Sequence, residues 1–195
     1  MLNKIVDSIN AAVPGAKAQL VTAEDPKCDG SIVVEGMKIH AICAHLKASG
    51  LANALQCISG VDYTEYLEVV YVFAKFDTEN PASFMLKART TDRVTGNLDS
   101  IVYLYPAANF QERECFDMLG IRFNNHPDHR RILCPDDWQG FPLRKDYVAQ
   151  KNYGDMQVYP EGKMNMPDRE FIVRQDMISK AQQAASGVPA NGKVQ

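Results

Sequence analysis

Three consecutive segments with the composition of β-strands, joined by very short turns, constrain the fold of this chain most strongly. They are rich in β-branched and aromatic residues and span Leu55–Val61, Tyr66–Phe76 and Ser83–Thr90. The connections, Gly60–Thr64 and Asp77–Pro81, are too short for a helical crossover, which needs roughly a dozen residues. We therefore expect these three strands to pair antiparallel in one sheet.

Helices lie before and after these strands rather than alternating with them. An amphipathic helix is predicted at the N-terminus, and two more are predicted over Met37–Ser49 and Ala107–Leu119. Short strands are predicted over Gln19–Thr22 and Ser31–Val34. This segregation predicts an α+β fold, with a mixed or antiparallel sheet covered by helices, in a single domain over residues 1–147.

The composition is that of a globular protein with little net charge. Of 195 residues, 46% are hydrophobic and 23% charged, and the formal net charge is −3. A nucleic-acid binder normally has a strongly basic surface, so we expect no nucleic-acid partner. The longest apolar run, Val69–Ala74, is far short of the roughly 20 residues that span a bilayer. Asp7 and Asn10 interrupt any export signal at the N-terminus, which predicts that the protein is not exported.

The cysteines and glycines favour no cofactor site in this chain. The five cysteines are Cys28, Cys43, Cys57, Cys115 and Cys134. They are widely spaced and contain no CxxC pair, which argues against disulfides, a zinc site or an iron–sulfur cluster. We expect small, buried or half-buried thiols in a reducing compartment. The chain also lacks the GxGxxG and P-loop patterns of nucleotide-binding sites.

The sequence changes character near Val148. Residues 148–195 lack a sustained hydrophobic period, apart from a possible short helix over 169–184, and 186–195 are expected to be disordered. A long segment without its own core often lies on another surface, so we expect an extended, partner-binding tail. The alternative is a flexible C-terminus that binds nothing.

One carboxylate of the helix Ala107–Leu119 falls on the apolar face. Glu112 lies among Ala108, Cys115, Phe116 and Leu119, so we expect its side chain to be at least partly buried. A buried carboxylate needs a cation or hydrogen-bond donors, or it is held protonated. We predict that it pairs with one of the arginines that follow. The candidate cationic side chains are His126, Arg130, Arg131, Arg144 and Lys145.

The other charges of this helix leave three interpretations open. Arg113 and Asp117 are four residues apart and form at most a weak surface ion pair if exposed. The dense charges that follow can form an internal ion-pair network, a docking surface or a catalytic site. Trp138 and Phe141 fit either a turn fixed in the protein's own core or an apolar groove of a partner.

Two enzyme signatures are weak. His126 and His129 form an HxxH pattern, but it lacks the glutamate of HExxH, and Pro127 prevents a regular helix between them. Cys115 and His126 could act as nucleophile and base, but the apolar position of Cys115 raises its thiol pKa. We expect neither a metal site nor a catalytic cysteine.

The segment from Pro106 to Tyr147 resembles the C subunit of NADH:quinone oxidoreductase, respiratory complex I, whose mitochondrial counterpart is the thirty-kilodalton subunit. The residues that match the family's pattern are Glu112, Arg113, Glu114, Asp117, Met118, Leu119, His126, Arg130, Ile132 and Leu133. The later WQGFPLRKDY and the earlier VDY at 61–63 also agree. The chain departs at Phe110, where Trp is usual, at His129, where Leu is common, and at Val148, where Pro is common; Leu119 is apolar as the pattern requires but stands where an aromatic residue is common.

The resemblance implies an accessory subunit of the peripheral arm, bound chiefly to the D subunit and also near the B and I subunits. It implies no catalytic residue, cofactor or metal in this chain. FMN, iron–sulfur clusters and quinone belong to neighbouring subunits, and NADH acts only through the complex. The implied location is the cytoplasmic face of the inner (plasma) membrane, or the matrix side in an organelle.

The signature then implies docking rather than catalysis. The residues assigned to docking are Glu112, Arg113, Glu114, Asp117, His126, Arg130, Arg131, Trp138, Arg144, Lys145 and Asp146. An alternative within the same superfamily is the equivalent subunit of a membrane-bound hydrogenase or of a quinone reductase with another donor. An alternative from another class is a metal-dependent hydrolase that uses His126 and His129.

Overall fold

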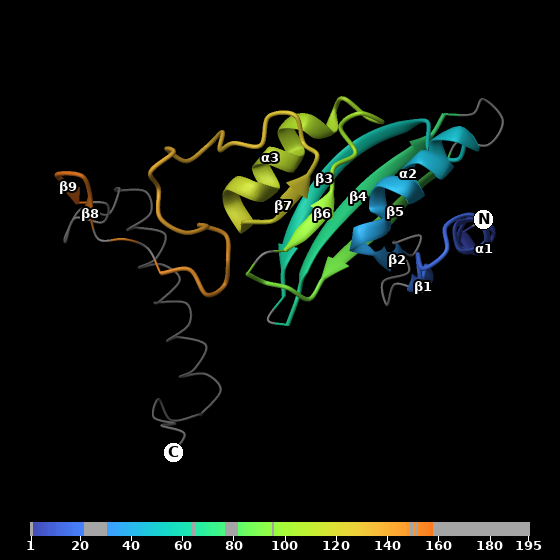
Figure 1. Cartoon of the computed structure of the whole chain (residues 1–195), viewed down its shortest axis with the longest axis horizontal. Coiled ribbons are helices and arrows are strands. Elements are labelled where there is room, and N and C mark those ends of the chain that lie inside the picture. The colour runs from blue at the N-terminus through green and yellow to red at the C-terminus, as the bar shows by residue number, and fades with distance from the viewer. Residues whose placement is uncertain are drawn as a thin grey trace, which may run out of the picture. The chain divides into compact units, whose positions relative to one another are not determined.

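A five-stranded mixed sheet forms the centre of the fold (Figure 1). The computed structural model describes residues 2–21, 31–63, 65–76, 82–94, 96–148, 150 and 152–157. The strands are β1 (Gln19–Val21), β2 (Ser31–Glu35), β3 (Ala54–Asp62), β4 (Leu67–Lys75) and β5 (Ala82–Thr90). Their order across the sheet is β1-β2-β5-β4-β3.

The three predicted neighbours do form an antiparallel meander. Strand β4 pairs antiparallel with both β3 and β5, and β2 joins β5 in parallel. Along β4, Leu67, Val69, Tyr71 and Phe73 are buried. The valines between them, Val70 and Val72, face the other side of the sheet and are only half-buried. This alternation is what a sheet with one fully covered face requires. The predicted α+β class and the mixed sheet are confirmed.

Helices cover one face of this sheet. They are α1 (Leu2–Ala12), the 3₁₀ turn η1 (Gly36–Lys38), α2 (Ile39–Ala48) and α3 (Ala108–Leu119). Burial raises the pKa of Tyr71 in β4 well above its ordinary value, and Glu112 of α3 and Cys43 of α2 raise it further. Helices α2 and α3 therefore both lie near Tyr71 and on the same face of the sheet, as Figure 1 shows.

A small pair of strands was not predicted from the sequence. Strands β6 (Asn97–Asp99) and β7 (Arg122–Asn124) pair in parallel, and α3 connects them. Each contributes one buried apolar side chain, Leu98 or Phe123, to the core. The other residues of these strands are polar, so neither segment has the composition of a strand.

The chain divides into two compact units, Met1–Ala149 and Gln150–Gln195. In the second unit the described residues form a hairpin of β8 (Asn152–Tyr153) and β9 (Met156–Gln157). The helix predicted over 169–184 and the disorder predicted over 186–195 lie outside the described residues. None of the described helices has the length and apolar composition that a membrane crossing requires.

Candidate functional site

The signature segment folds as α3, strand β7 and an irregular stretch, residues 125–148, which we call the strap. Helix α3 lies against β3, where the Gln111 side-chain carbonyl accepts the backbone N–H of Ile58. Gly60 of β3 makes this approach possible, because a Cβ there would overlap the Leu119 side chain. The helix thus provides a fixed base on which the strap folds.

Asp117 holds the middle of the strap. Its side chain is 0% exposed, and one oxygen accepts the N–H groups of Ile132, Leu133 and Cys134 at 3.0, 2.6 and 2.9 Å. Burial alone would raise the pKa of this carboxyl. The three N–H groups and the Arg131 guanidinium outweigh burial and hold the pKa below its ordinary value. Asp117 is therefore ionised and inside the fold, not on the exposed side of the helix as predicted.

Arg131 connects α3 with the later part of the strap. Its Nη1 donates to Asp117 Oδ1 at 2.8 Å. Its Nη2 donates to the carbonyls of Gly140 at 2.9 Å and of Trp138 at 3.2 Å. The guanidinium also lies over the Phe141 ring, 5.2 Å from its centroid. One side chain thereby ties the end of α3 to residues 138–141 of the strap.

Arg113 and Asp117, four residues apart on α3, are not exposed and do not pair with each other. The Arg113 side chain is 8% exposed and pairs with Asp128 of the strap, with 3.2 Å between Nη1 and Oδ2. Its Nε also donates to the carbonyl of Arg130 at 3.2 Å. The strap covers the polar side of α3, so both charged residues turn to it instead of to each other.

Glu112 is buried as predicted, but its predicted pairing with an arginine is wrong. The carboxylate accepts the Ser100 hydroxyl at 2.7 Å and the N–H of Ile101 at 2.9 Å. Burial raises its pKa to about 7, although these two hydrogen bonds and nearby His40 oppose the shift. Neutral donors from the end of β6 therefore stabilise this carboxyl in place of a cation.

His126 and His129 are neutral structural side chains. His126 Nε2 lies 3.9 Å from Glu112 but donates to the carbonyl of Asn109 at 3.2 Å, and its Nδ1 accepts the N–H of Asp128. His129 Nε2 accepts the N–H of Phe123 at 3.1 Å. Burial lowers the pKa of both imidazoles, so the contact of His126 with Glu112 is not an ion pair.

Within the described residues, no group of three or more His, Cys, Asp or Glu side chains is arranged to hold a metal ion.

The described cysteines are free thiols. Cys43 and Cys115 are buried, Cys134 is half-buried and Cys57 is exposed, while Cys28 lies outside the described residues. Burial raises the pKa of the Cys115 thiol to about 12, with smaller contributions from Glu114 and Glu112. Such a thiol is protonated at neutral pH and is a poor nucleophile.

The last part of the strap returns to the end of α3. Leu143 N–H donates to the Met118 carbonyl at 3.0 Å, and Arg144 Nε donates to the Leu119 carbonyl at 2.6 Å.

Phe141 packs on Gly120, whose φ of +73° closes the helix. Of the two interpretations of this aromatic turn, the structure favours the protein's own core for Phe141. Trp138 is half-buried and donates its indole N–H to the Tyr147 hydroxyl at 3.1 Å.

Sequence reasoning missed Asp62 and Arg93. Asp62, at the end of β3, is 6% exposed and accepts the N–H of Lys145 at 2.8 Å. Arg93 pairs with Asp62 and also lies 3.5 Å from Asp146. Burial would raise the pKa of Asp62, but the Arg93 hydrogen bond and the Lys145 N–H lower it overall. The VDY at 61–63 was the available signal, since it contains Asp62 and matches the family.

The outer side of the strap carries the exposed residues. Of the predicted docking residues, the exposed ones are Glu114, Arg130, Lys145 and Asp146, whereas Trp138, Arg131 and Arg144 are half-buried. Large apolar side chains are also exposed there: Leu133 and Leu143 at 63% each and Val148 at 86%. Most of the signature's charge therefore stabilises the fold, and a smaller surface of charged and apolar side chains is exposed.

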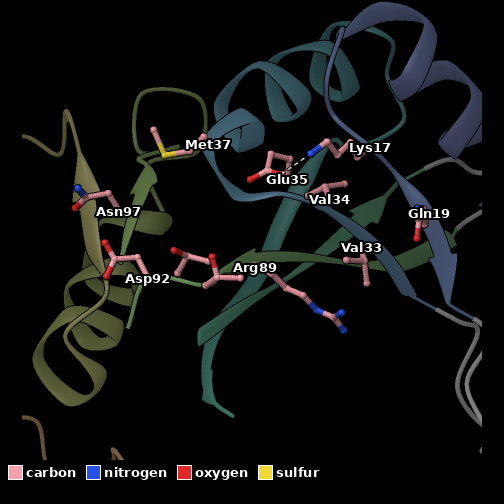
Figure 2. Close-up of a pocket in the computed structure, with 11 residues that line it drawn as sticks. Lys17, Gln19, Val33, Val34, Glu35, Met37, Arg89, Asp92 and Asn97 are labelled. Atoms are coloured by element: carbon pink, nitrogen blue, oxygen red, sulfur yellow. Dashed lines mark ion pairs between the residues drawn. The ribbon is translucent and has the colours of Figure 1, made fainter. Parts of the chain in front are cut away.

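A cavity of about 550 Å³ lies elsewhere, at the ends of β2 and β5 (Figure 2). Figure 2 shows Lys17 and Glu35 joined by an ion pair of 3.6 Å, and Arg89 pointing away from Asp92. Arg89 pairs with Glu68 at 2.6 Å. Both cations at this cavity are thus already paired with carboxylates of the chain itself.

The sequence of this chain matches a known protein family. The family model of the respiratory-chain NADH dehydrogenase 30-kDa subunit matches residues 32–153, which include the sheet except β1 and the first residue of β2, and also α3 and the strap. The chain belongs to this family. As a member of the 30-kDa subunit family, it is a subunit of the complex I type, and the predicted family is confirmed.

Individual relatives agree with the 30-kDa subunit assignment. The chain is 38% identical over 125 residues to the C subunit of the NADH-quinone oxidoreductase of Moorella thermoacetica, covering 64% of this chain and 84% of the relative. It is 36% identical over 135 residues to the same subunit of Geobacter sulfurreducens, covering 68% and 83%. It is also 42% identical over 122 residues to the C subunit of the F(420)H(2) dehydrogenase of Methanosarcina mazei, covering 61% and 75%.

A solved structure shares the fold. It is a chain of the membrane-bound sulfane sulfur reductase, an archaeal respiratory membrane complex, with a TM-score of 0.61 and 23% identity. The match covers 83% of this chain and 96% of the other. The α+β arrangement is therefore shared at low sequence identity.

Proposed function

We propose that this chain is an accessory subunit in the peripheral arm of a proton-translocating NADH:quinone oxidoreductase, and that it docks on the D subunit through the outer side of the strap. The B and I subunits lie nearby in this proposal. In this proposal the chain lies peripherally on the cytoplasmic face of the inner (plasma) membrane, or on the matrix side in an organelle. The similarity to C subunits of NADH-quinone oxidoreductases supports this role.

One observation carries the docking proposal. Leu133 and Leu143 flank the last turn of α3, because their N–H groups donate to the Asp117 carboxylate and the Met118 carbonyl. Their backbones are fixed by the fold, yet both side chains are 63% exposed. A rigid apolar pair surrounded by charged residues is typical of a surface that a partner covers.

The buried charges support a structural rather than a catalytic role for the signature. Asp117, Arg113 and Arg131 are engaged by the backbone and side chains of the strap. His126 and His129 hydrogen-bond to backbone groups of the fold, and the described cysteines are free thiols. We therefore place FMN, iron–sulfur clusters and quinone in neighbouring subunits, with no cofactor held by this chain.

The docking proposal is tested with the double variant Leu133→Glu, Leu143→Glu. Both side chains are exposed, so the melting temperature of the purified chain should stay close to that of the wild type. Purification of the tagged chain from membranes should recover the other subunits with the wild type but not with the double variant. The matched control is Phe76→Glu, which changes an apolar side chain that is 68% exposed at the opposite end of β4. Equal recovery with both variants would refute the proposal.

A second candidate is the equivalent subunit of a quinone reductase with another electron donor, because the Methanosarcina mazei relative is an F(420)H(2) dehydrogenase subunit. The purified complex separates the two candidates. Oxidation of NADH by that complex supports the first, and oxidation of F(420)H(2) without NADH oxidation supports the second.

A further inference from the structure

Arg144 lies in the strap without a carboxylate partner among the described residues. Its Nε donates to the Leu119 carbonyl at 2.6 Å, and its guanidinium lies over the Phe141 ring, 4.9 Å from the centroid. Its Nη2 is buried and has no hydrogen-bond partner in the described part of the chain. A buried guanidinium nitrogen without an acceptor is costly, because it has lost its hydration and gained nothing in exchange.

The other arginines of similar burial behave differently. Arg89 pairs with Glu68 at 2.6 Å, Arg113 with Asp128 at 3.2 Å and Arg131 with Asp117 at 2.8 Å. Arg93 pairs with Asp62. Of the five described arginines that are buried or half-buried, only Arg144 has no carboxylate within ion-pair distance in the described structure. Asp62 is near enough for Arg144 to help lower its pKa, but it pairs with Arg93, so no carboxylate of the described residues pairs directly with Arg144.

A cavity opens beside this guanidinium. It has a volume of about 350 Å³, and Phe141, Arg144, Tyr147 and Val148 line it. Asp146 also lines it, but its side chain is 67% exposed and lies 3.5 Å from Arg93, so its charge is partly offset by a residue other than Arg144. Aromatic walls beside a guanidinium suit a carboxylate on a short carbon chain.

The surroundings of the cavity indicate where that carboxylate comes from. Val148 at the rim is 86% exposed, and the neighbouring Leu143 is 63% exposed. An apolar rim around a cation is typical of a protein interface, where arginine and aromatic residues are enriched and water is excluded from the charge. A free carboxylic acid would leave these apolar side chains in water.

We propose that this cavity receives an Asp or Glu side chain of the partner subunit and that Arg144 pairs with it in the assembled complex. This inference rests on the proposed docking of the strap and specifies the ion pair that forms when the strap docks. In the complex the partner's carboxylate approaches between Phe141 and Tyr147, and a small rotation of the guanidinium brings its outer nitrogens into contact with it.

The first test maps the partner by photocrosslinking in intact membranes. A benzophenone side chain introduced at Val148 reports what enters the cavity, and one at Leu133 reports whether the strap docks at all. The expected result is crosslinks from both positions to another subunit, with an Asp or Glu within two residues of the site reached from Val148. Crosslinks from Leu133 alone, or a Val148 crosslink to a segment without an acid, would overturn this inference and leave the docking proposal intact. No crosslink from either position would overturn both.

The second test exchanges the charges. Arg144→Glu should speed dissociation of the chain from the purified complex by roughly thirty-fold or more, because it leaves the partner's carboxylate buried and unpaired. Arg122→Gln, which removes an exposed arginine of β7, is the control and should change dissociation little. Replacing the mapped acid of the partner by Arg should restore slow dissociation of Arg144→Glu, which simple misfolding of the variant cannot do. Failure of that restoration would overturn the pairing.

Discussion

Two carboxylates five residues apart on α3 show how burial alone does not decide protonation. Glu112 and Asp117 are both 0% exposed. Asp117 accepts three N–H groups and a guanidinium, and its pKa falls below the ordinary value. Glu112 accepts one hydroxyl and one N–H, and its pKa rises to about 7 because burial outweighs these donors. The number and charge of the donors set the difference.

Glu112 should make the stability of the chain fall as the pH rises. Its pKa is about 7 in the folded chain and 4.5 ordinarily, so the folded state binds more protons between these values. The stabilisation is complete below pH 4.5 and is lost as the pH rises through 7. The loss is about 3 kcal/mol if the unfolded chain titrates normally. Urea unfolding at pH 5, 6, 7 and 8 should therefore show Glu112→Gln gaining on the wild type with rising pH, and a constant difference would contradict this.

Asp117→Asn should release the strap. The variant loses the charge that pairs with Arg131 and keeps only one oxygen for the N–H groups of the strap. Removing one partner of a buried ion pair costs about 3 kcal/mol or more in the free energy of unfolding. Limited proteolysis should then cut within residues 125–148 of the folded variant.

The matched control for this substitution is Glu114→Gln. It makes the same acid-to-amide change on the exposed side of α3 and should shift the free energy of unfolding by less than about 0.5 kcal/mol. If both variants lose the same stability, Asp117 does not hold the strap.

At the scale of the elements, the strap depends on the left-handed residue that ends α3. Gly120 has φ +73°, and a Cβ there would lie 2.5 Å from the Phe141 ring. Gly50 ends α2 with φ +68°, and nothing lies within 4 Å of a Cβ at that position. The two glycines share a backbone conformation and differ in what packs on them.

This pair separates backbone strain from strap packing. Gly50→Ala should cost about 1 kcal/mol of unfolding free energy, the penalty of a left-handed alanine. Gly120→Ala should cost roughly 1–3 kcal/mol more, because the Phe141 ring must move as well. Thermal and urea unfolding of the two variants measure the difference. Equal losses would show that Phe141 does not pack tightly on the helix end.

The elements that sequence could predict are those with a strong local pattern. Strands β3, β4 and β5 and the helices follow from alternation and helical spacing, and their bounds agree within one or two residues. Strands β6 and β7 are only three residues each and mostly polar, so no local pattern marks them. Their pairing depends on α3 bringing residues 97–99 and 122–124 together.

The sequence predicted which residues make up the candidate site, but not which residues they contact. Helical spacing correctly placed Glu112 on the buried face, yet it put Asp117 and Arg113 in solvent. That error has a physical cause, since spacing describes only one covered face and the strap covers a second one. The path of an irregular segment depends on long-range hydrogen bonds, such as the Lys145 N–H to Asp62, which no local pattern contains.

At the scale of the whole molecule, the signature serves the fold on its inner side, and in the proposed function its outer side meets a partner. The strap is held at the end of α3 by Asp117, and at the end of β3 by Asp62. The backbone N–H groups of Leu133 and Leu143 are held by this arrangement, while both side chains are exposed. Docking on a prearranged surface loses little conformational entropy.

Hydroxyl-radical footprinting of the free chain and of the complex purified from membranes tests this account most directly. Leu133 and Leu143 should be oxidised in the free chain, where each is 63% exposed, and protected several-fold in the complex. Phe76, which is 68% exposed at the other end of the sheet, should react equally in both. Unchanged oxidation of the two leucines on assembly would contradict the central claim that the outer side of the strap is the docking surface.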